Sequence, residues 1–117
     1  MKKMINLFLI FFFLTACNSK LYETIDTNKA NEILNNGAVL IDVRTLEEFN
    51  REHIPNAINI PLDQIDTIDL DKNTTIIVYC QTGVRSKEAV EKMVDMGYTS
   101  LYNLDGGLLN WGGSLEE

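Results

Sequence analysis

The segment from Tyr79 to Ser86 places a single cysteine, Cys80, between a predicted strand and a predicted helix. Residues 74–79 are mostly β-branched or aromatic, as in a buried strand. Residues 86–96 repeat apolar side chains at helical spacing. At such a junction, backbone N–H groups and the positive end of the helix favour an ionised thiol. Because the thiolate is the nucleophile, Cys80 is the predicted catalytic residue and chemical centre of the chain.

The loop that follows the cysteine supplies groups able to hold an anion beside the thiol. The predicted substrate-binding groups are inward-pointing N–H groups of six consecutive residues: Gln81, Thr82, Gly83, Val84, Arg85 and Ser86. Gly83 is expected to adopt a backbone angle that a side chain would resist. Ser86 is expected to cap the helix, and Arg85 either completes the anion site or supports the loop through a carboxylate.

Short apolar runs alternate with helical patterns along the rest of the chain, which indicates an α/β fold with a parallel sheet. The predicted strands are residues 22–25, 38–41, 57–60, 75–79 and 99–104. The predicted helices are residues 27–35, 45–52 and 86–96, a short turn at 62–65, and a final helix from Gly106 that contains Trp111. Thr45 and Glu48 have the spacing of a capping box.

The first sixteen residues have the pattern of a signal peptide. Lys2 and Lys3 precede an apolar run, residues 4–14, that is too short for a conventional transmembrane helix. The run ends in Leu14-Thr15-Ala16-Cys17, which closely resembles a bacterial lipobox. That resemblance implies cleavage before Cys17 and attachment of a lipid to its thiol.

We therefore expect three parts: a lipoprotein signal peptide at 1–16, a lipidated cysteine with a short tether at 17–21, and a folded domain at 22–117. The predicted location is the cell envelope, on the periplasmic or extracytoplasmic face of a bacterial membrane. An ordinary secretory signal with a chance cysteine and an uncleaved anchor are the alternatives.

The composition indicates one small acidic domain. The chain has 117 residues, 45% of them hydrophobic, and a net charge of −7. Loss of residues 1–16 removes two lysines and no acid, which makes the charge −9. Such a surface excludes nucleic acid as an expected partner, so an anion site must be local.

The two cysteines also bear on function. If Cys17 is lipidated, Cys80 has no partner within the chain for a disulfide. A lone thiol outside the cytoplasm is open to oxidation, which favours a chemical role over that of a buried structural thiol.

Four stretches of the domain resemble the rhodanese family, single-domain type. They are Ile41–Arg44 with Glu48-Phe49, His53–Pro61, Cys80–Ser86, and Leu104–Gly107 with Trp111. The resemblance implies a three-layer α/β/α domain around a mostly parallel five-stranded sheet. It also implies a sulfurtransferase that carries sulfur as a cysteine persulfide, with a small sulfur-containing anion or a persulfide as donor and a thiol or cyanide as acceptor.

The length of the loop favours sulfur chemistry over phosphate chemistry. Four residues separate Cys80 from Arg85, whereas the related tyrosine phosphatases have five. A longer ring of N–H groups surrounds a phosphoryl group, and a shorter ring closes around one sulfur anion. A non-enzymatic persulfide or redox carrier is the first alternative, and a related phosphatase or arsenate reductase is the second. The expected reaction requires no cofactor, and the acids and the single histidine do not have metal-ligand spacing.

One position departs from the family pattern. Gln81 stands where many thiosulfate-using members have arginine or another cation. Thr82 is also uncharged, which leaves Arg85 and the neighbouring Lys87 as the cations of the loop. We therefore expect weaker binding of a dianionic donor, so that thiosulfate is a test substrate rather than the natural one.

The other family residues are expected to be structural. Asp42 and Arg44 follow a predicted strand and favour a buried ion pair or a cap, with Glu48 as a further partner for Arg44. His53 lies in a turn motif far along the chain from Cys80, and a thiolate activated by loop amides needs no general base. Trp111 is expected in the core or in a pocket wall.

Overall fold

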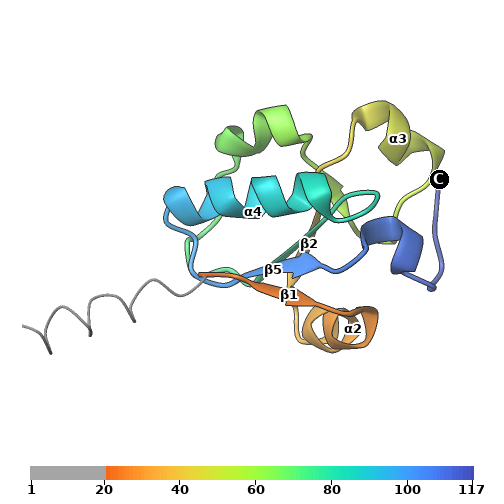
Figure 1. Ribbon diagram of the computed structural model, residues 1–117, viewed down its shortest axis with the longest axis horizontal. Helices are drawn as coiled ribbons and strands as arrows, with labels where there is room; N and C mark the ends of the chain where they lie inside the picture. Colours follow the sequence, from red (N-terminus) through yellow and green to blue (C-terminus); the bar gives the residue numbers. More distant parts are fainter. Residues whose placement is uncertain (1–20) are drawn as a thin grey trace, which may run out of the picture.

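Five strands form one parallel sheet in the computed structural model, which describes residues 21–117 (Figure 1). In spatial order β1-β5-β4-β2-β3, every neighbouring pair is parallel. The strands are β1 (Glu23–Ile25), β2 (Val39–Asp42), β3 (Ile58–Asn59), β4 (Ile76–Tyr79) and β5 (Leu101–Leu104). Because all five run in one direction, their carboxyl ends meet at one edge of the sheet.

Helices cover both faces of this sheet. The α-helices are α2 (Thr27–Asn35), α3 (Leu46–Arg51) and α4 (Val84–Asp95), and the 3-10 helices are η1 (Leu62–Thr67) and η2 (Gly107–Asn110). Helix α4 and η1 lie on one face, and α2 lies on the opposite face (Figure 1). The predicted three-layer α/β/α architecture is therefore confirmed.

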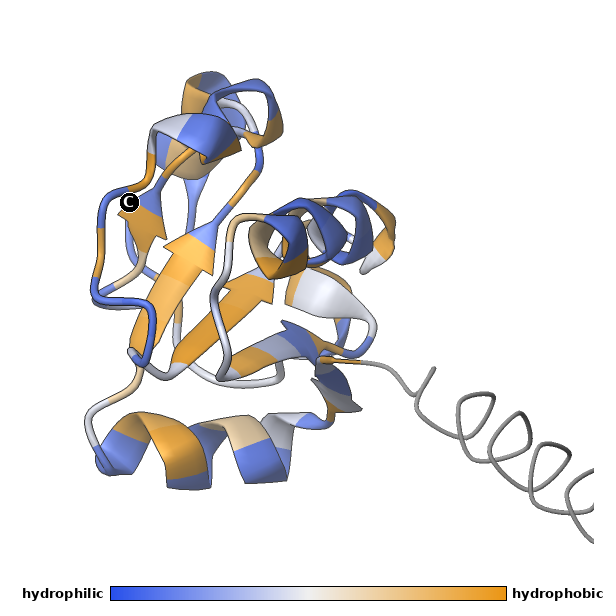
Figure 2. Ribbon diagram, turned by 90° about the vertical axis from the view of Figure 1, so that its left-hand side faces the viewer, coloured by the Kyte–Doolittle hydropathy of each residue, from blue (hydrophilic) through white to orange (hydrophobic). Residues whose placement is uncertain are grey.

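The central strand β4 shows why the core has two halves. All four of its side chains are buried, and they point alternately to the two faces. Ile76 and Val78 pack on the α4 side, whereas Ile77 and Tyr79 pack on the α2 side. Figure 2 shows these central strands as hydrophobic ribbon between helices of mixed character. The alternation continues past the strand, which places Cys80 on the α4 side.

Most of the predicted boundaries agree with the structure to within about two residues. The capping box is present, since Thr45 Oγ1 accepts from the Glu48 N–H at 3.2 Å and Glu48 Oε1 accepts from the Thr45 N–H at 3.1 Å. Asp26 caps α2 by a single side-chain bond, since its Oδ1 accepts from the Lys29 N–H at 2.8 Å.

Two predictions about helix ends were wrong. Helix α4 begins at Val84 with Gly83 as its N-cap, so Ser86 lies inside the first turn and does not cap it. The final segment is a single 3-10 turn that ends before Trp111, which lies just beyond it in the α2-side core. The first error arose because Gly83, with a positive φ, begins α4 without a side-chain cap, whereas the start of the final segment at Gly106 agrees with the prediction.

The predicted signal peptide and the predicted lipidation site, Cys17, lie outside the described residues. Within residues 21–117, no helix is long and apolar enough to span a bilayer.

Candidate active site

Cys80 lies at the carboxyl end of β4, in the loop that leads into α4. Its side chain is buried, and its Sγ accepts a hydrogen bond from the Gly83 N–H at 3.1 Å. Gly83 makes this turn with φ +104°, a left-handed angle that other residues avoid. The loop thus bends back on its own cysteine, as predicted for Gly83. The site occupies the edge where parallel α/β sheets carry their ligands.

The start of the loop, at Cys80 and Gln81, is supported by η2. The Cys80 carbonyl accepts from the Leu108 N–H at 2.9 Å, and the Gln81 carbonyl accepts from the Leu109 N–H at 3.2 Å. Gly107 permits this approach, because a Cβ at that position would overlap the Cys80 carbonyl oxygen. The sheet edge, α4 and η2 together position the cysteine.

The surroundings of Cys80 act on its pKa in opposite directions. Burial raises the pKa of the thiol, whereas the hydrogen bond with the Ser86 side chain and those from the N–H groups of Ser86, Gly83 and Thr82 lower it. The lowering effects prevail, so the pKa of Cys80 falls below that of a free thiol. The N–H groups of the loop therefore favour the thiolate, which is the reactive form.

A buried asparagine that sequence reasoning missed completes the surroundings of the sulfur. The Cys80 thiol lies 3.4 Å from Ser86 Oγ, and the Ser86 hydroxyl donates to Asn103 Oδ1 at 2.5 Å. Ser86 is fully buried and Asn103, on β5, is 5% exposed. The available signal was a polar residue inside an apolar strand, at the end that faces the active-site edge.

Arg85 supports the loop through a carboxylate. Its two Nη atoms donate to Glu48 on α3, with distances of 2.7 and 3.0 Å. The Arg85 guanidinium and the Thr45 cap hold the pKa of Glu48 down at about 2, against the opposing effect of burial. This contact is the one expected of the supporting role, and Glu48 offsets the charge of Arg85.

Asp42 and Arg44 form the buried ion pair that the sequence indicated. Arg44 Nη2 donates to Asp42 Oδ2 at 2.8 Å, with both side chains almost fully buried. Arg44 also donates to Gln81 Oε1 at 3.2 Å, which holds the first residue after the cysteine. The further pairing of Arg44 with Glu48 was wrong, because Glu48 is engaged by Arg85.

His53 and Trp111 lie away from the sulfur. His53 stacks on Phe49 at a centroid distance of 3.7 Å, and its Nδ1 lies 2.8 Å from the Phe49 carbonyl oxygen. Its Nε2 lies 3.4 Å from a carboxylate oxygen of Glu116, and the two residues also pair through their backbones. His53 therefore fastens the C-terminal segment, and Trp111 packs in the core.

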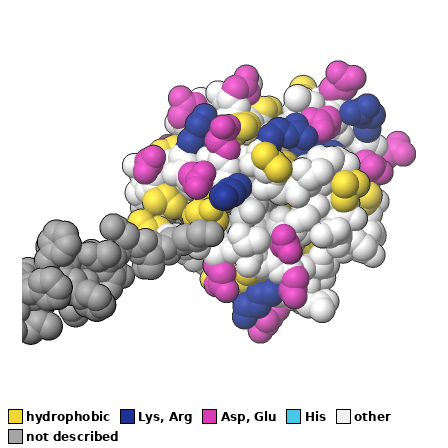
Figure 3. Space-filling model, viewed as in Figure 1, with side chains coloured by type: hydrophobic (Ala, Val, Ile, Leu, Met, Phe, Trp, Pro, Cys, Tyr) yellow, Lys and Arg dark blue, Asp and Glu magenta, His cyan; other side chains and the backbone are white. Residues whose placement is uncertain are grey.

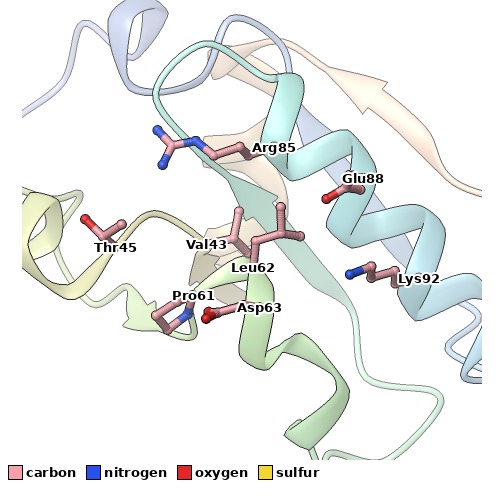
Figure 4. Close-up of a pocket in the computed structure, with 8 residues that line it drawn as sticks. All are labelled: Val43, Thr45, Pro61, Leu62, Asp63, Arg85, Glu88 and Lys92. Atoms are coloured by element: carbon pink, nitrogen blue, oxygen red, sulfur yellow. The ribbon is translucent and has the colours of Figure 1, made fainter.

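Two pockets border the loop. One of about 330 Å³ is lined by Arg44, Glu48, Arg51, Glu52 and Gln81. The other, of about 360 Å³, lies between α4 and η1 and is lined by Val43, Thr45, Pro61, Leu62, Asp63, Arg85, Glu88 and Lys92 (Figure 4). Figure 3 shows acidic side chains scattered over one face of the molecule, with fewer basic side chains among them. Among the described residues, no three His, Cys, Asp or Glu side chains are arranged to hold a metal.

Comparisons with known proteins agree with this geometry. Thiosulfate sulfurtransferase PspE of Escherichia coli is 46% identical over 70 residues, which are 56% of this chain and 67% of that protein. Thiosulfate sulfurtransferase GlpE of Pseudomonas savastanoi is 33% identical over 94 residues, 77% of this chain and 87% of that protein. The chain spans only 19% and 23% of the length of two larger curated relatives.

The fold is also found in solved structures. A rhodanese-like domain protein from Staphylococcus aureus matches with a TM-score of 0.72 at 35% identity, over 80% of this chain and 96% of that chain. The family model of the rhodanese-like domain matches residues 26–114, which include the cysteine loop and every strand but β1. The chain therefore belongs to the rhodanese-like domain family.

Proposed function

We propose that this protein is a sulfurtransferase that moves sulfane sulfur from thiosulfate or a persulfide, through a Cys80 persulfide, to a thiol or cyanide. The observation that carries the proposal is the state of Cys80: a buried sulfur with a lowered pKa that accepts a hydrogen bond from its own loop. Two of the relatives are named thiosulfate sulfurtransferases, which supports transfer of sulfur through Cys80.

The first step loads the cysteine. The Cys80 thiolate attacks the outer sulfur of the donor and forms a new S–S bond with it. The original bond of the donor breaks, and its electron pair leaves with sulfite, or with a thiolate when the donor is a persulfide. Charge is conserved, because the anion of Cys80 becomes the anion of the outer sulfur of the persulfide.

The second step unloads it. An acceptor thiolate or cyanide attacks the outer sulfur, the bond to Cys80 breaks, and the negative charge returns to Sγ. The N–H groups of the loop stabilise the anion in both steps. The exchange involves only sulfur nucleophiles or cyanide and the cysteine, and it requires no cofactor.

Access to the sulfur requires motion of the loop. Cys80 is 0% exposed, whereas Thr82 and Val84 lie on the outer side of the loop and are exposed. A donor reaches the sulfur when these outer residues move aside, while η2 and β4 hold the cysteine itself.

The charges of the loop favour persulfide donors over thiosulfate. Arg85 is neutralised by Glu48, and Arg44 by Asp42. Gln81 contributes only a neutral side chain, and it is already bonded to Arg44. A dianion therefore gains little from these cations, because each of them serves a carboxylate.

The test uses the full chain in a mild detergent. After incubation with thiosulfate or polysulfide, intact mass reports one added sulfur, and a tryptic digest assigns it to the peptide of residues 73–85. Cyanide then releases thiocyanate from the loaded protein. Cys80→Ser is expected to lose both products, and Cys17→Ser to keep both.

The outcomes separate the alternatives. An adduct on Cys80 that no thiol or cyanide removes would identify a sulfur carrier instead. Failure of every sulfur donor to modify Cys80 would overturn the proposal.

We also propose that Cys17 carries a lipid that anchors the domain to the outer face of a bacterial membrane. The sequence of residues 1–17 supports this, and β1 begins at Glu23, six residues after the cysteine. Metabolic labelling with a radioactive fatty acid is expected to mark the wild type and not Cys17→Ser. An unlabelled wild-type protein would contradict the anchor and leave the proposed activity untouched.

A further inference from the structure

Three polar groups from three different elements lie in a row within the core. Cys80 Sγ lies 3.4 Å from Ser86 Oγ, which lies 2.5 Å from Asn103 Oδ1. Cys80 follows β4, Ser86 is in α4 and Asn103 is on β5, and none is more than 5% exposed. Water does not reach Cys80 or Ser86, so the partners of the sulfur on this side are set by the protein alone.

Counting protons shows that this arrangement fits the neutral thiol. The Ser86 hydroxyl has one proton, and it donates that proton to Asn103 Oδ1. Ser86 Oγ can then only accept from the Cys80 S–H. The row therefore holds a protonated sulfur and offers no hydroxyl proton to a sulfur anion.

The thiolate requires a different arrangement of the same atoms. The sulfur has lost its proton, so the Ser86 hydroxyl must turn and donate to it. Ser86 Oγ and Asn103 Oδ1 would then be two acceptors facing each other at 2.5 Å. Rotation of the asparagine amide by half a turn removes this conflict, because Nδ2 then donates to Ser86 Oγ.

This rotation breaks no other hydrogen bond. Among residues 21–117, the Asn103 side chain has one hydrogen-bond partner, the Ser86 hydroxyl. The amide is therefore free to present either its oxygen or its nitrogen, a choice that an aspartate or a leucine lacks.

We propose that Asn103 is a positioning residue whose amide turns with the charge on Cys80 Sγ and directs the Ser86 hydroxyl toward or away from the sulfur. With the oxygen facing Ser86, the row fits the thiol. With the nitrogen facing Ser86, a charge-assisted chain runs from the amide through the hydroxyl to the sulfur anion.

The row of Cys80, Ser86 and Asn103 also has a role in the proposed sulfur transfer, and this role rests on the proposed function. The charge is on Sγ in the free thiolate, moves to the outer sulfur when Cys80 is loaded, and returns to Sγ when the acceptor takes that sulfur. The row therefore stabilises the negative charge on Sγ when Sγ is the leaving group of the unloading step.

The ionisation of Cys80 is measured on the full chain in detergent, from the ultraviolet absorbance of the thiolate against pH. Each variant is read as the difference from the same variant carrying Cys80→Ser, which removes the contribution of every other group. This readout needs no sulfur donor and no access of a reagent to the buried sulfur. A failure of the proposed role of Asn103 can therefore be distinguished from a failure of the proposed sulfur transfer.

Ser86→Ala is expected to raise the thiol pKa by about one unit, as the loss of one hydrogen bond to an anion implies. Asn103→Leu, similar in volume, is expected to raise it by about half a unit, because the chain that ends on the anion loses its first donor. Asn103→Asp is expected to raise it further, because an acceptor alone keeps the hydroxyl turned away.

The decisive comparison repeats both Asn103 variants in the Ser86→Ala background. Without the hydroxyl, Asn103→Leu is expected to have no effect on the thiol pKa. Asn103→Asp is expected to raise the thiol pKa only through the negative charge of the new carboxylate. Equal shifts with and without the Ser86 hydroxyl would overturn the proposal, as would no shift for Asn103→Leu alone.

The charged groups around the loop stay constant in these variants. They are Arg85 from α4, paired with Glu48 from α3; Arg44, paired with Asp42 from β2; and the exposed Lys87 of α4. A change in the thiol pKa is therefore assigned to the row and not to a displaced ion pair, provided that near-ultraviolet circular dichroism matches the wild type.

Discussion

At the scale of single residues, the proposed preference for persulfide donors rests on the charges around Cys80. The two guanidinium groups nearest the loop are each paired with a carboxylate. Gln81 lies between the cysteine and Arg44 and adds a neutral amide. The loop therefore relies on backbone N–H groups, which act over a shorter range than a formal charge does.

A cation at Gln81 is expected to improve thiosulfate use. Gln81→Arg adds a positive charge at the first residue after Cys80. The ratio of kcat/KM for thiosulfate, a dianion, to kcat/KM for a monoanionic persulfide donor is expected to rise several-fold over the wild-type ratio. Gln81→Leu is the matched control, since it also loses the bond to Arg44 and adds no charge. A ratio for Gln81→Arg no higher than that of Gln81→Leu would mean that charge in the loop is not limiting.

At the scale of elements, the link between α3 and α4 connects the capping box to the cysteine loop. Glu48 completes the cap of α3 and also accepts from Arg85, in the first turn of α4. The pKa of Glu48 falls to about 2 because the folded state binds its charged form. Stability from this link is therefore present above the unfolded pKa, about 4.5, and is lost as the pH falls toward 2.

Glu48→Gln is expected to weaken this dependence on pH. At neutral pH the variant is expected to lose about 1 kcal/mol, a value kept small because the Arg85 side chain is 37% exposed. Below pH 4 the difference from the wild type is expected to shrink, as followed by urea unfolding with Trp111 fluorescence. Glu47→Gln, exposed on the same helix, is the control and is expected to change little. A constant difference between Glu48→Gln and the wild type from pH 7 to 3 would contradict the assignment.

At the scale of the whole molecule, the cysteine loop depends on a contact with η2, which follows β5 much later in the chain. Gly107 and Gly112 offer a matched comparison, because both have positive φ, +59° and +69°. A Cβ at Gly112 meets nothing within 4 Å, whereas a Cβ at Gly107 would lie 2.8 Å from the Gln81 carbonyl oxygen and overlap that of Cys80.

Gly112→Ala is expected to cost about 1 kcal/mol of stability, from its backbone angle alone. Gly107→Ala is expected to cost at least about 2 kcal/mol more, because backbone must move to make room. It is also expected to raise the thiol pKa of Cys80, since a displaced loop no longer aims its N–H groups at the sulfur. Unfolding in urea and the thiolate absorbance measure the two effects, and equal behaviour of the two variants would show that η2 does not hold the loop.

Much of the architecture was predictable from local patterns. The strand 75–79, the helix after it and the capping box at Thr45 each depend on neighbours within a few residues, so the sequence carries their full signal. The start of α4 was harder to predict, because the left-handed angle of Gly83 replaces a polar cap with backbone geometry. Helix α4 therefore begins two residues before Ser86.

The sequence by itself determined that Cys80 follows a buried strand, that four residues separate it from Arg85, and that the fold is a parallel α/β sheet of the rhodanese-like family. Only the tertiary structure decided the partners that lie far apart in the sequence. Arg85 binds Glu48 across 37 positions of chain, and Ser86 binds Asn103 across 17. These pairs depend on which elements are neighbours in the folded chain. They also depend on burial, because a polar group that is buried away from water needs a hydrogen-bond partner. Neither the neighbours nor the burial can be read from local sequence.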